Sequence, residues 1–431
     1  MNDVFSIKPF SFPEGFLFGS AVAGHQVEGD NIHSSHYVRE LEKQQKNPNA
    51  VLSGKACNHY EMYREDIDIL ATLEHQVFRF SIEWARIEPV EGEFCPEAVA
   101  HYLDVLQTLK EKGIKVFLTL VHFTTPAWFY KLGGFEKAEN LTYFYRYVAY
   151  IAPIVAPYVD YWCIFNEFNA GLTEAAFHKK FNCTRAHAKA YHIIKAISDK
   201  PISTAHAYLG YFPKRMNDPF DKALMNYADA FCNEFFFHAM RTGELVMAGI
   251  DGVYDKELKG TVDFWSINSY DRKMRDARRP SGRGKRYSMT FTPVIDEAYY
   301  QDEFFPELFV HALTRLRDKP VFISENGCPA DDDAFRLVYI TEYLAAIHEA
   351  MEMGVEVWGY LYWSLLDNYE WGSFKPRYGL VDVDREHDFK RTIKPSGYFL
   401  REIIREGGYR PEMLRAYLSE LPRVTYDPGE V

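Results

Sequence analysis

The stretch YWCIFNE at residues 161–167 is a short apolar run that ends in an amide and a carboxylate. An apolar run of this length is typical of a strand that is buried on both faces of a parallel sheet. Similar runs recur along the chain and are separated by longer segments. We predict eight strands, at residues 16–20, 77–81, 116–120, 161–165, 202–205, 264–268, 321–324 and 357–361.

The segments between these strands carry the spacing of amphipathic helices. Residues 60–73 and 335–353 repeat apolar side chains every three or four positions, as a helix with one buried face requires. Eight strands that alternate with helices predict the α/β class and a closed parallel (β/α)8 TIM barrel. The chain contains no linker or low-complexity tract, so we interpret residues 1–431 as one domain rather than two or three.

Two polar stretches, at residues 30–55 and 272–292, are interpreted as loops. The first ends in Asn-Pro-Asn and Ser-Gly, and the second is basic and contains glycine. Each follows a predicted strand, which places both stretches on the C-terminal face of the barrel, where active sites of this fold are built. The expected architecture is therefore a barrel with elaborated loops on that face.

Composition restricts the class of partner. The net charge is −12 and the most basic stretch, residues 272–286, is interpreted as a solvated loop, so no nucleic acid or anionic polymer is expected to bind. No apolar run approaches about 18 residues, and residues 1–12 lack the apolar core of a signal peptide, so no membrane span is expected. Six cysteines without zinc-ligand spacing predict free thiols, no metal site and a cytoplasmic location.

Polar side chains follow most of the predicted strands at the point where each strand ends. Because the carboxyl ends of all strands of a parallel barrel meet at one mouth, these side chains should converge. Burying so many polar groups for stability alone is costly, so we interpret them as a binding site for a polyhydroxylated ligand. In chain order they are Gln26, Arg79, Glu83, His122, Asn166, Glu167, Asn268, Tyr270, Glu325, Asn326, Trp363, Glu370 and Trp371.

Six stretches around these residues resemble glycoside hydrolase family 1, the β-glucosidase and β-galactosidase family. They are FPEGFLFGSAVAGHQVEG at 12–29, FRFSIEWARI at 78–87, NE at 166–167, VDFWSINSY at 262–270, ISENG at 323–327 and YWSLLDNYEWGSFKPRYGLVDVD at 362–384. A single NE or ENG occurs by chance, but six stretches in this order do not. The resemblance extends from about residue 12 to about residue 411 and also implies a TIM barrel.

The resemblance implies catalytic roles for two carboxylates. Glu167 corresponds to the acid and base of a retaining β-glycosidase, and Glu325 corresponds to its nucleophile. The site needs neither a metal nor a cofactor, since two carboxylates supply the acid, the base and the nucleophile. Arg79, Tyr270 and Asn268 correspond to residues around the nucleophile. We expect Arg79 and Tyr270 to lower the pKa of Glu325, and burial and repulsion to raise the pKa of Glu167.

The resemblance also implies a sugar pocket. In it Asn166 binds the sugar 2-hydroxyl, while Gln26, His122 and Glu370 bind other hydroxyls and Trp363 and Trp371 line the walls. Taken alone, the two tryptophans would be interpreted as core residues and His122 as a satisfied core histidine. Tyr378 stands where phenylalanine is usual, Phe123 replaces a tryptophan, Phe168 replaces a proline and Asn58 replaces an aspartate. Phe123 cannot donate an indole N–H, so one contact to a glycone hydroxyl is expected to be lost. Because Phe168 and the segment after it border the leaving-group side, that side is the least transferable part of the resemblance.

The predicted substrate is a terminal, non-reducing β-D-glycoside, with glucosides first and galactosides or fucosides alongside. One alternative is a 6-phospho-β-glycosidase, because Ser373, Lys375 and Tyr378 lie near Glu370 in the sequence. Glu370 argues against it, since a carboxylate repels a phosphate that carries about −1.5 to −2 charges. The other alternative is a non-catalytic sugar-binding relative, against which the presence of both Glu167 and Glu325 argues. Transfer to an acceptor sugar and the oligomeric state stay open.

Overall fold

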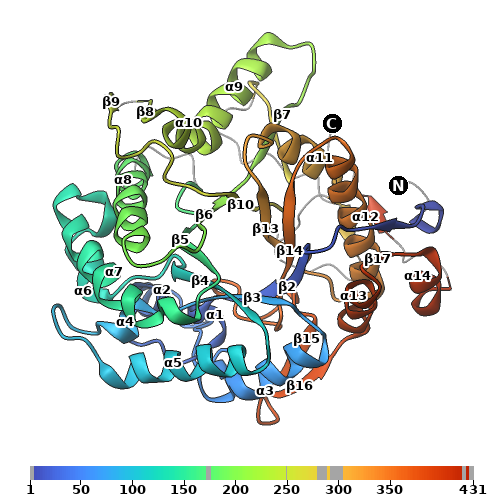
Figure 1. The fold of residues 1–431 in the computed structure, drawn as a ribbon, viewed down its shortest axis with the longest axis horizontal. Helices are drawn as coiled ribbons and strands as arrows, with labels where there is room; N and C mark the ends of the chain where they lie inside the picture. The colour runs from blue at the N-terminus through green and yellow to red at the C-terminus, as the bar shows by residue number, and fades with distance from the viewer. Residues whose placement is uncertain are drawn as a thin grey trace.

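The structure is a computed structural model that describes residues 4–170, 176–248, 250–278, 289–291, 304–419 and 424–426. Its centre is a closed barrel of parallel strands in the order β2-β3-β4-β5-β6-β10-β13-β14 (Figure 1). The strands are β2 Leu17–Ala21, β3 Val77–Ser81, β4 Lys115–Val121, β5 Tyr161–Asn166, β6 Ile202–Ala207, β10 Trp265–Asn268, β13 Val321–Asn326 and β14 Val357–Trp363. All eight predicted strands are confirmed, and the predicted fold class with them.

Side chains fill the interior of the barrel. Phe117 of β4 and Phe322 of β13 meet there, with ring centroids 5.2 Å apart. The wall is equally tight where β2 and β3 pair, because a Cβ added at Gly19 would lie 1.7 Å from the carbonyl oxygen of Val77. The barrel is therefore a packed core, and an open cavity can form only at one of its ends.

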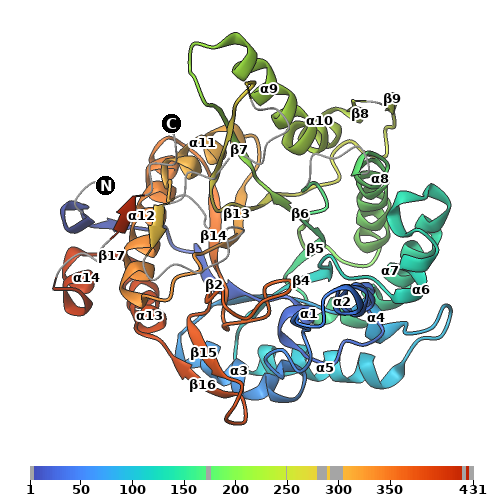
Figure 2. The same cartoon turned by 180° about the vertical axis from the view of Figure 1, so that it is seen from behind.

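Helices form the outer ring in both views (Figures 1 and 2). The ring helices are α3 His59–Thr72, α5 Pro96–Glu111, α7 Leu141–Val155, α8 Ala176–Lys195, α10 Phe235–Thr242, α11 Glu307–Arg315, α12 Asp333–Glu352 and α13 Pro395–Glu406. The helices predicted at residues 60–73 and 335–353 correspond to α3 and α12. Each buries an apolar side against the strands, as Ile67 and Leu70 of α3 illustrate, and this burial stabilises the ring.

Further helices and strand pairs lie around the barrel. The helices are α1 Gly24–Val27, α2 Ser35–Lys46, α4 Trp84–Ile87, α6 Ala127–Lys131, α9 Pro219–Asp229 and α14 Pro411–Tyr417. The strand pairs are β1 Phe10–Ser11 with β17 Gly408–Tyr409, β7 Gly210–Pro213 with β11 Arg272–Arg275, β8 Glu244–Met247 with β9 Ile250–Tyr254, β12 Met289–Phe291 with β18 Val424–Tyr426, and β15 Val381–Asp384 with β16 Lys390–Ile393.

The loop interpretation of residues 30–55 is wrong, because this stretch contains the twelve-residue helix α2. Ser34 caps the helix, since its hydroxyl oxygen accepts a hydrogen bond from the backbone N–H of Tyr37 at 3.1 Å. The helix buries Glu40, a polar residue, so the sequence shows no apolar stripe that would mark it. In the second stretch, residues 272–275 form β11 and residues 289–291 form β12, while residues 279–288 and 292 lie outside the described part.

All six cysteines are unpaired, and five of them are buried. Among the described residues, no helix is both long and apolar enough to cross a membrane. Within the same residues, no group of three or more His, Cys, Asp or Glu side chains is arranged to hold a metal ion.

Candidate active site

A cavity of about 330 Å³ opens at the C-terminal ends of the barrel strands. Its volume falls in the range of small-molecule sites. All the predicted residues line it except Arg79, Glu83 and Asn326. Glu83 and Asn326 are buried away from the cavity, where Glu83 accepts a hydrogen bond from Thr124 and Asn326 donates one to Tyr339. A larger, shallower groove at the opposite end, beside the segments that lead into β5 and β6, is lined by two lysines and one aspartate and has no pair of carboxylates. The chemistry is therefore concentrated in the cavity at the C-terminal ends.

Glu325 lies in β13 with both carboxylate oxygens hydrogen bonded. Arg79, from β3, donates from Nη1 to Oε1 at 2.5 Å, and the hydroxyl of Tyr270 donates to Oε2 at 2.7 Å. Burial raises the pKa of Glu325, while Arg79 and Tyr270 oppose the rise. The expected lowering of its pKa is therefore not the net result, because removing the charge from water at a buried strand end outweighs the two contacts.

Glu167 directly follows β5, and no cation among the described residues forms an ion pair with it. Its Oε1 accepts a hydrogen bond from Nδ2 of Asn268 at 2.9 Å. Burial and repulsion from Glu325 raise the pKa of Glu167 to about 8, against the lowering effects of Asn268 and Arg79. The expected direction for Glu167 is thus the one found. At neutral pH the cavity holds a protonated carboxyl group at Glu167 and a carboxyl group paired with arginine at Glu325.

Asn166 connects the two carboxyl groups to a histidine. Its Oδ1 accepts hydrogen bonds from Nη2 of Arg79 at 2.7 Å and from Nδ2 of Asn268 at 2.9 Å. The amide nitrogen therefore faces Nε2 of His122, 3.1 Å away, and donates to it. Burial lowers the pKa of His122 well below its usual value, so the ring is neutral. Its proton then resides on Nδ1, which has no partner in the structure and is available to donate to a hydroxyl.

Gln26 and Glu370 also supply acceptors to the cavity. Nε2 of Gln26 donates to Oδ1 of Asn368 and to the carbonyl oxygen of Tyr369, both at 3.0 Å. This fixes the amide so that Oε1, which has no partner in the structure, is the atom left to accept a hydrogen bond. Nε1 of Trp363 donates to Oε1 of Glu370 at 3.1 Å. Burial raises the pKa of Glu370 to about 8, with repulsion from Glu325 adding to it.

Aromatic rings, among them Phe123, Trp363 and Trp371, also line the cavity. Trp363 stacks on His122 with ring centroids 5.8 Å apart, and Phe123 meets Trp371 edge-on at 5.3 Å. His36 of α2 packs against Trp371 at 4.9 Å. His36 was not predicted as a site residue, and the only sequence signal for it was the placement of residues 30–55 on the C-terminal face.

Three non-glycine residues of the cavity have left-handed backbones, with φ of 63° at Phe123 and 49° at both Glu167 and Trp371. Such conformations cost about 1–3 kcal/mol each and persist only where the surroundings enforce them. At Glu167 the backbone N–H donates to the carbonyl oxygen of Ala205 at 2.7 Å, which holds the turn. Gly327 has no alternative, because an added Cβ would lie 1.8 Å from the carbonyl oxygen of Trp363.

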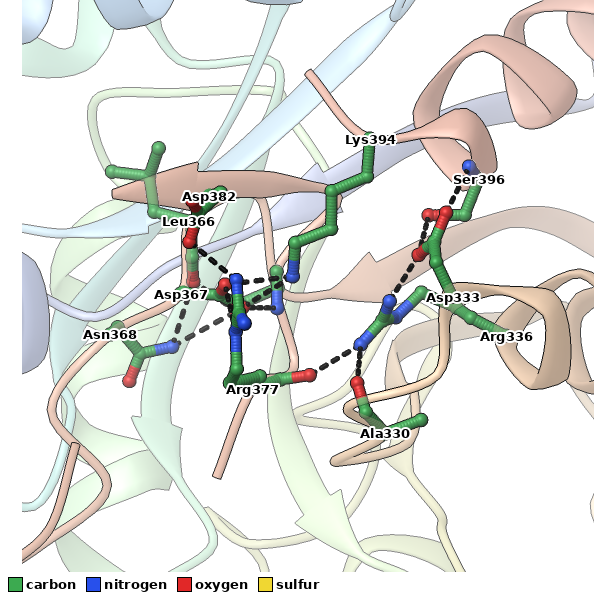
Figure 3. Close-up of polar contacts among 12 residues, drawn as sticks. Ala330, Asp333, Arg336, Leu366, Asp367, Asn368, Arg377, Asp382, Lys394 and Ser396 are labelled. Carbon is green, nitrogen blue, oxygen red and sulfur yellow. Dashed lines mark hydrogen bonds and ion pairs between the residues drawn. The ribbon is translucent and has the colours of Figure 1, made fainter. Parts of the chain in front are cut away.

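The loop between β14 and β15 carries Glu370, Trp371 and Tyr378, and it is anchored at its base by a partly buried ionic cluster (Figure 3). The carboxylate of Asp367 accepts from Nζ of Lys394 at 2.7 Å and from Nε of Arg377 at 3.1 Å. It also accepts from the backbone N–H of Gly379 at 2.7 Å. The cluster lies outside the cavity and fixes the loop that the cavity uses. We name Asp367, Arg377 and Lys394 the loop clamp.

Known proteins with a similar sequence or structure are glycosidases. A sequence model of glycosyl hydrolase family 1 matches residues 8–409. The chain is 28% identical to a β-galactosidase of Sulfolobus acidocaldarius, over 96% of this chain and 99% of that protein. It is also 28% identical to a 1,4-β-D-glucan glucohydrolase of Thermotoga neapolitana, over 92% and 99%. A solved β-glycosidase from Pyrococcus horikoshii superposes with a TM-score of 0.83 at 31% identity, covering 96% of this chain and 100% of that one.

Proposed function

The chain belongs to glycosyl hydrolase family 1, and on that basis we propose that it is a retaining β-glycosidase with glucosides as its preferred substrates. It removes terminal, non-reducing β-D-glycosyl residues. The observation that carries the proposal is the pair of carboxyl groups, Glu167 and Glu325, which line one cavity in opposed environments. A cytoplasmic location is part of the proposal and is supported by the six unpaired cysteines.

The two carboxyl groups act in two steps. In the first, Glu167 gives its proton to the glycosidic oxygen while a Glu325 oxygen attacks the anomeric carbon, so the leaving group departs as an alcohol and a glycosyl ester forms. In the second, the Glu167 carboxylate takes a proton from water, whose oxygen displaces Glu325 from the anomeric carbon. Arg79 and Tyr270 hold the Glu325 carboxylate in place and accommodate its change of charge.

The cavity favours a neutral sugar over a phosphorylated one. The burial and the Glu325 charge that raise the pKa of Glu370 also disfavour any added anion beside it. Of the three residues that raised the phosphate alternative, only Tyr378 lines the cavity. Lys375 is exposed, and the hydroxyl of Ser373 accepts a hydrogen bond from the Lys375 backbone N–H at 3.1 Å. Relatives named β-galactosidase and 1,4-β-D-glucan glucohydrolase support the same substrate class.

A panel of nitrophenyl β-glycosides tests the proposal. Glucoside, galactoside, fucoside and glucoside-6-phosphate are compared by kcat/KM on the same enzyme preparation. We expect the glucoside to be cleaved fastest and the 6-phosphate to be cleaved very slowly. Faster cleavage of the 6-phosphate would contradict the neutral-sugar assignment, and absence of turnover on every member would favour the sugar-binding alternative.

The Glu370→Ser variant adds a second arm to the panel. Removal of the Glu370 carboxyl group takes away the acceptor that Trp363 orients, so cleavage of the glucoside should weaken. Ser373→Ala is the matched control, because Ser373 is buried in the same loop and does not line the cavity. Equal losses in both variants would show that Glu370 acts only through the loop.

A further inference from the structure

Part of the cavity wall is formed by residues that no sequence motif indicated. They are Ala170, Tyr208, Leu209, Asp271 and Lys273. Tyr208 and Leu209 lie between β6 and β7, and Asp271 directly precedes β11, which contains Lys273. In the barrel, β6 and β10 lie between β5, which leads to Glu167, and β13, which holds Glu325, whereas Gln26 follows β2 and Glu370 follows β14. Because the glycone is assigned to Gln26, His122 and Glu370, we assign the leaving group to the side of the mouth that holds Lys273. This assignment rests on the proposed function.

Lys273 and Asp271 form an ion pair at this wall. The ammonium nitrogen of Lys273 lies 2.6 and 2.7 Å from the two carboxylate oxygens of Asp271. The side chain of Asp271 is only 5% exposed, whereas that of Lys273 is 23% exposed. Parallel pairing of β11 with β7, in register Lys273↔Tyr211, sets the backbone of Lys273. A lysine ammonium has three N–H groups, so the pair leaves at least one of them for a ligand in the cavity.

The chemistry of this wall selects among classes of leaving group. An apolar leaving group would cover the ion pair and remove water from it without replacing the lost hydrogen bonds, which is costly. An anionic leaving group would approach Lys273 but would also meet the Asp271 carboxylate. A sugar presents neighbouring hydroxyls that donate and accept, which matches a donor and an acceptor side by side. Its C–H face also suits the apolar surface of Tyr208 and Leu209.

We propose that Lys273 and Asp271 form the subsite for the leaving group and that this group is a second sugar. The enzyme therefore acts on β-linked disaccharides and short oligosaccharides in preference to glycosides with apolar leaving groups. Lys273 and Glu167 line the same cavity, and the lysine lowers the pKa of Glu167, which agrees with a leaving group bound near both.

The test compares two substrates that share a glycone. Wild type and Lys273→Met are assayed at pH 6 with cellobiose and with nitrophenyl β-glucoside. Loss of one hydrogen bond to a charged group should lower kcat/KM for cellobiose by about ten- to a hundredfold. Nitrophenyl β-glucoside, which offers no hydroxyl at this wall, should change by less than threefold (about the scatter of such contacts). Equal changes on both substrates, or none on cellobiose, would overturn the proposal.

Two further variants keep the outcome interpretable. Lys214→Met is the matched control, because Lys214 pairs with Asp276 at 3.7 Å, is 28% exposed and does not line the cavity. It should leave both substrates unaffected. Asp271→Asn retains the shape of the pair and should also penalise cellobiose selectively, so it decides the matter if Lys273→Met fails to fold. Failure of wild type to cleave nitrophenyl β-glucoside would instead contradict the proposed function.

Discussion

At the scale of single residues, the guanidinium group of Arg79 connects the proposed nucleophile to the proposed hydroxyl ligands. Arg79 donates to Glu325 and also to Asn166, whose amide then points its nitrogen at His122. The same arginine thus sets the charge of the proposed nucleophile and the tautomer of a proposed hydroxyl ligand. Asn268 extends this arrangement to Glu167. Substitution of Arg79 would therefore disturb several roles together. Variants of the two carboxyl groups separate these roles better.

Glu325→Gln should lose nearly all turnover on every substrate, because an amide cannot form the glycosyl ester. Glu167→Ala should lose about 10²–10⁴-fold on a disaccharide, the usual contribution of a general acid, and far less on a dinitrophenyl glycoside, whose leaving group needs no proton. Azide should rescue Glu167→Ala and give a β-glycosyl azide. These outcomes are measured by steady-state kinetics and product analysis.

Glu342→Gln provides a matched control for the carboxyl variants. Burial raises the pKa of Glu342 to about 7, yet this residue lies on α12 and does not line the cavity. Its substitution should leave turnover unchanged. Full activity of Glu167→Ala on a disaccharide would show that Glu167 is not the acid.

The pH dependence of kcat/KM should reflect the same two groups in the free enzyme. Glu167 must be protonated, so activity should fall as the pH rises through about 8, its raised pKa. Glu325 must be ionised, so activity should also fall on the acid side, below the pKa of that group. In Glu167→Ala, assayed with a dinitrophenyl glycoside, the basic limb should disappear. An unchanged basic limb in this variant would assign that limb to another group.

At the scale of elements, the loop between β14 and β15 depends on contacts that lie outside the cavity. The loop clamp joins Asp367 to Lys394, which directly precedes α13, and to Arg377, which is next to Tyr378 (Figure 3). Asp367 is 3% exposed, so loss of a partner leaves a buried charge with less compensation. We therefore expect the clamp to position Glu370 and Tyr378, which line the cavity.

Lys394→Met should lower the melting temperature and should weaken glucoside cleavage mainly through KM. Breaking a buried ion pair costs about 3–5 kcal/mol. The cost is reduced here, because Asp367 keeps its hydrogen bonds from Arg377 and from the Gly379 N–H. A β-xyloside lacks the C6 hydroxymethyl group, whose hydroxyl we assign to Glu370, so the variant should lower kcat/KM for the xyloside less than for the glucoside. Lys195→Met, which breaks the 2.8 Å pair with Asp263 elsewhere, is the control. Equal penalties on both glycosides would make the clamp purely structural.

At the scale of the whole molecule, the buried carboxyl groups of the site lower the free energy of unfolding when they are ionised. Burial raises the pKa values of Glu167 and Glu370, each to about 8, so the folded state binds more protons than the unfolded chain, whose glutamates keep ordinary pKa values near 4.5. The contribution of such a group to stability is fully present below about pH 4.5 and is lost as the pH rises through about 8. The enzyme thus carries its largest penalty in the mildly alkaline range.

Glu370→Gln should therefore melt a few degrees above wild type at pH 8–9, although it should be less active. A glutamine has a similar shape and no charge, so the penalty, on the order of a few kcal/mol, disappears. The difference should shrink as the pH falls toward 5, where the wild-type carboxyl group is protonated in the folded state. Thermal melts across this pH range measure it, and a difference independent of pH would contradict the account.

The sequence by itself determined the barrel and placed most of the proposed site residues at one mouth. Strands buried on both faces must be continuously apolar, so all eight are visible as runs, and parallel closure forces their polar ends to one mouth. Gln26, His122 and Glu370 were therefore predictable as neighbours, although Gln26 and Glu370 are far apart in the sequence. The motif glycine Gly327 belongs to the same class, because only glycine fits beneath the Trp363 carbonyl.

Only the tertiary structure decided the features that depend on what surrounds a polar side chain. Helix α2 buries Glu40, which accepts hydrogen bonds from Ser53 and bonds to His25, so no apolar period announced it. The net pKa shift of Glu325 depends on how completely water is excluded, which no list of neighbours gives. Lys273 reaches the cavity because β11 pairs with β7, a pairing between segments that share no sequence signal. The spacing of apolar residues in the sequence indicates which apolar side chains are buried. Where a charged side chain is buried depends on its neighbours in the assembled fold.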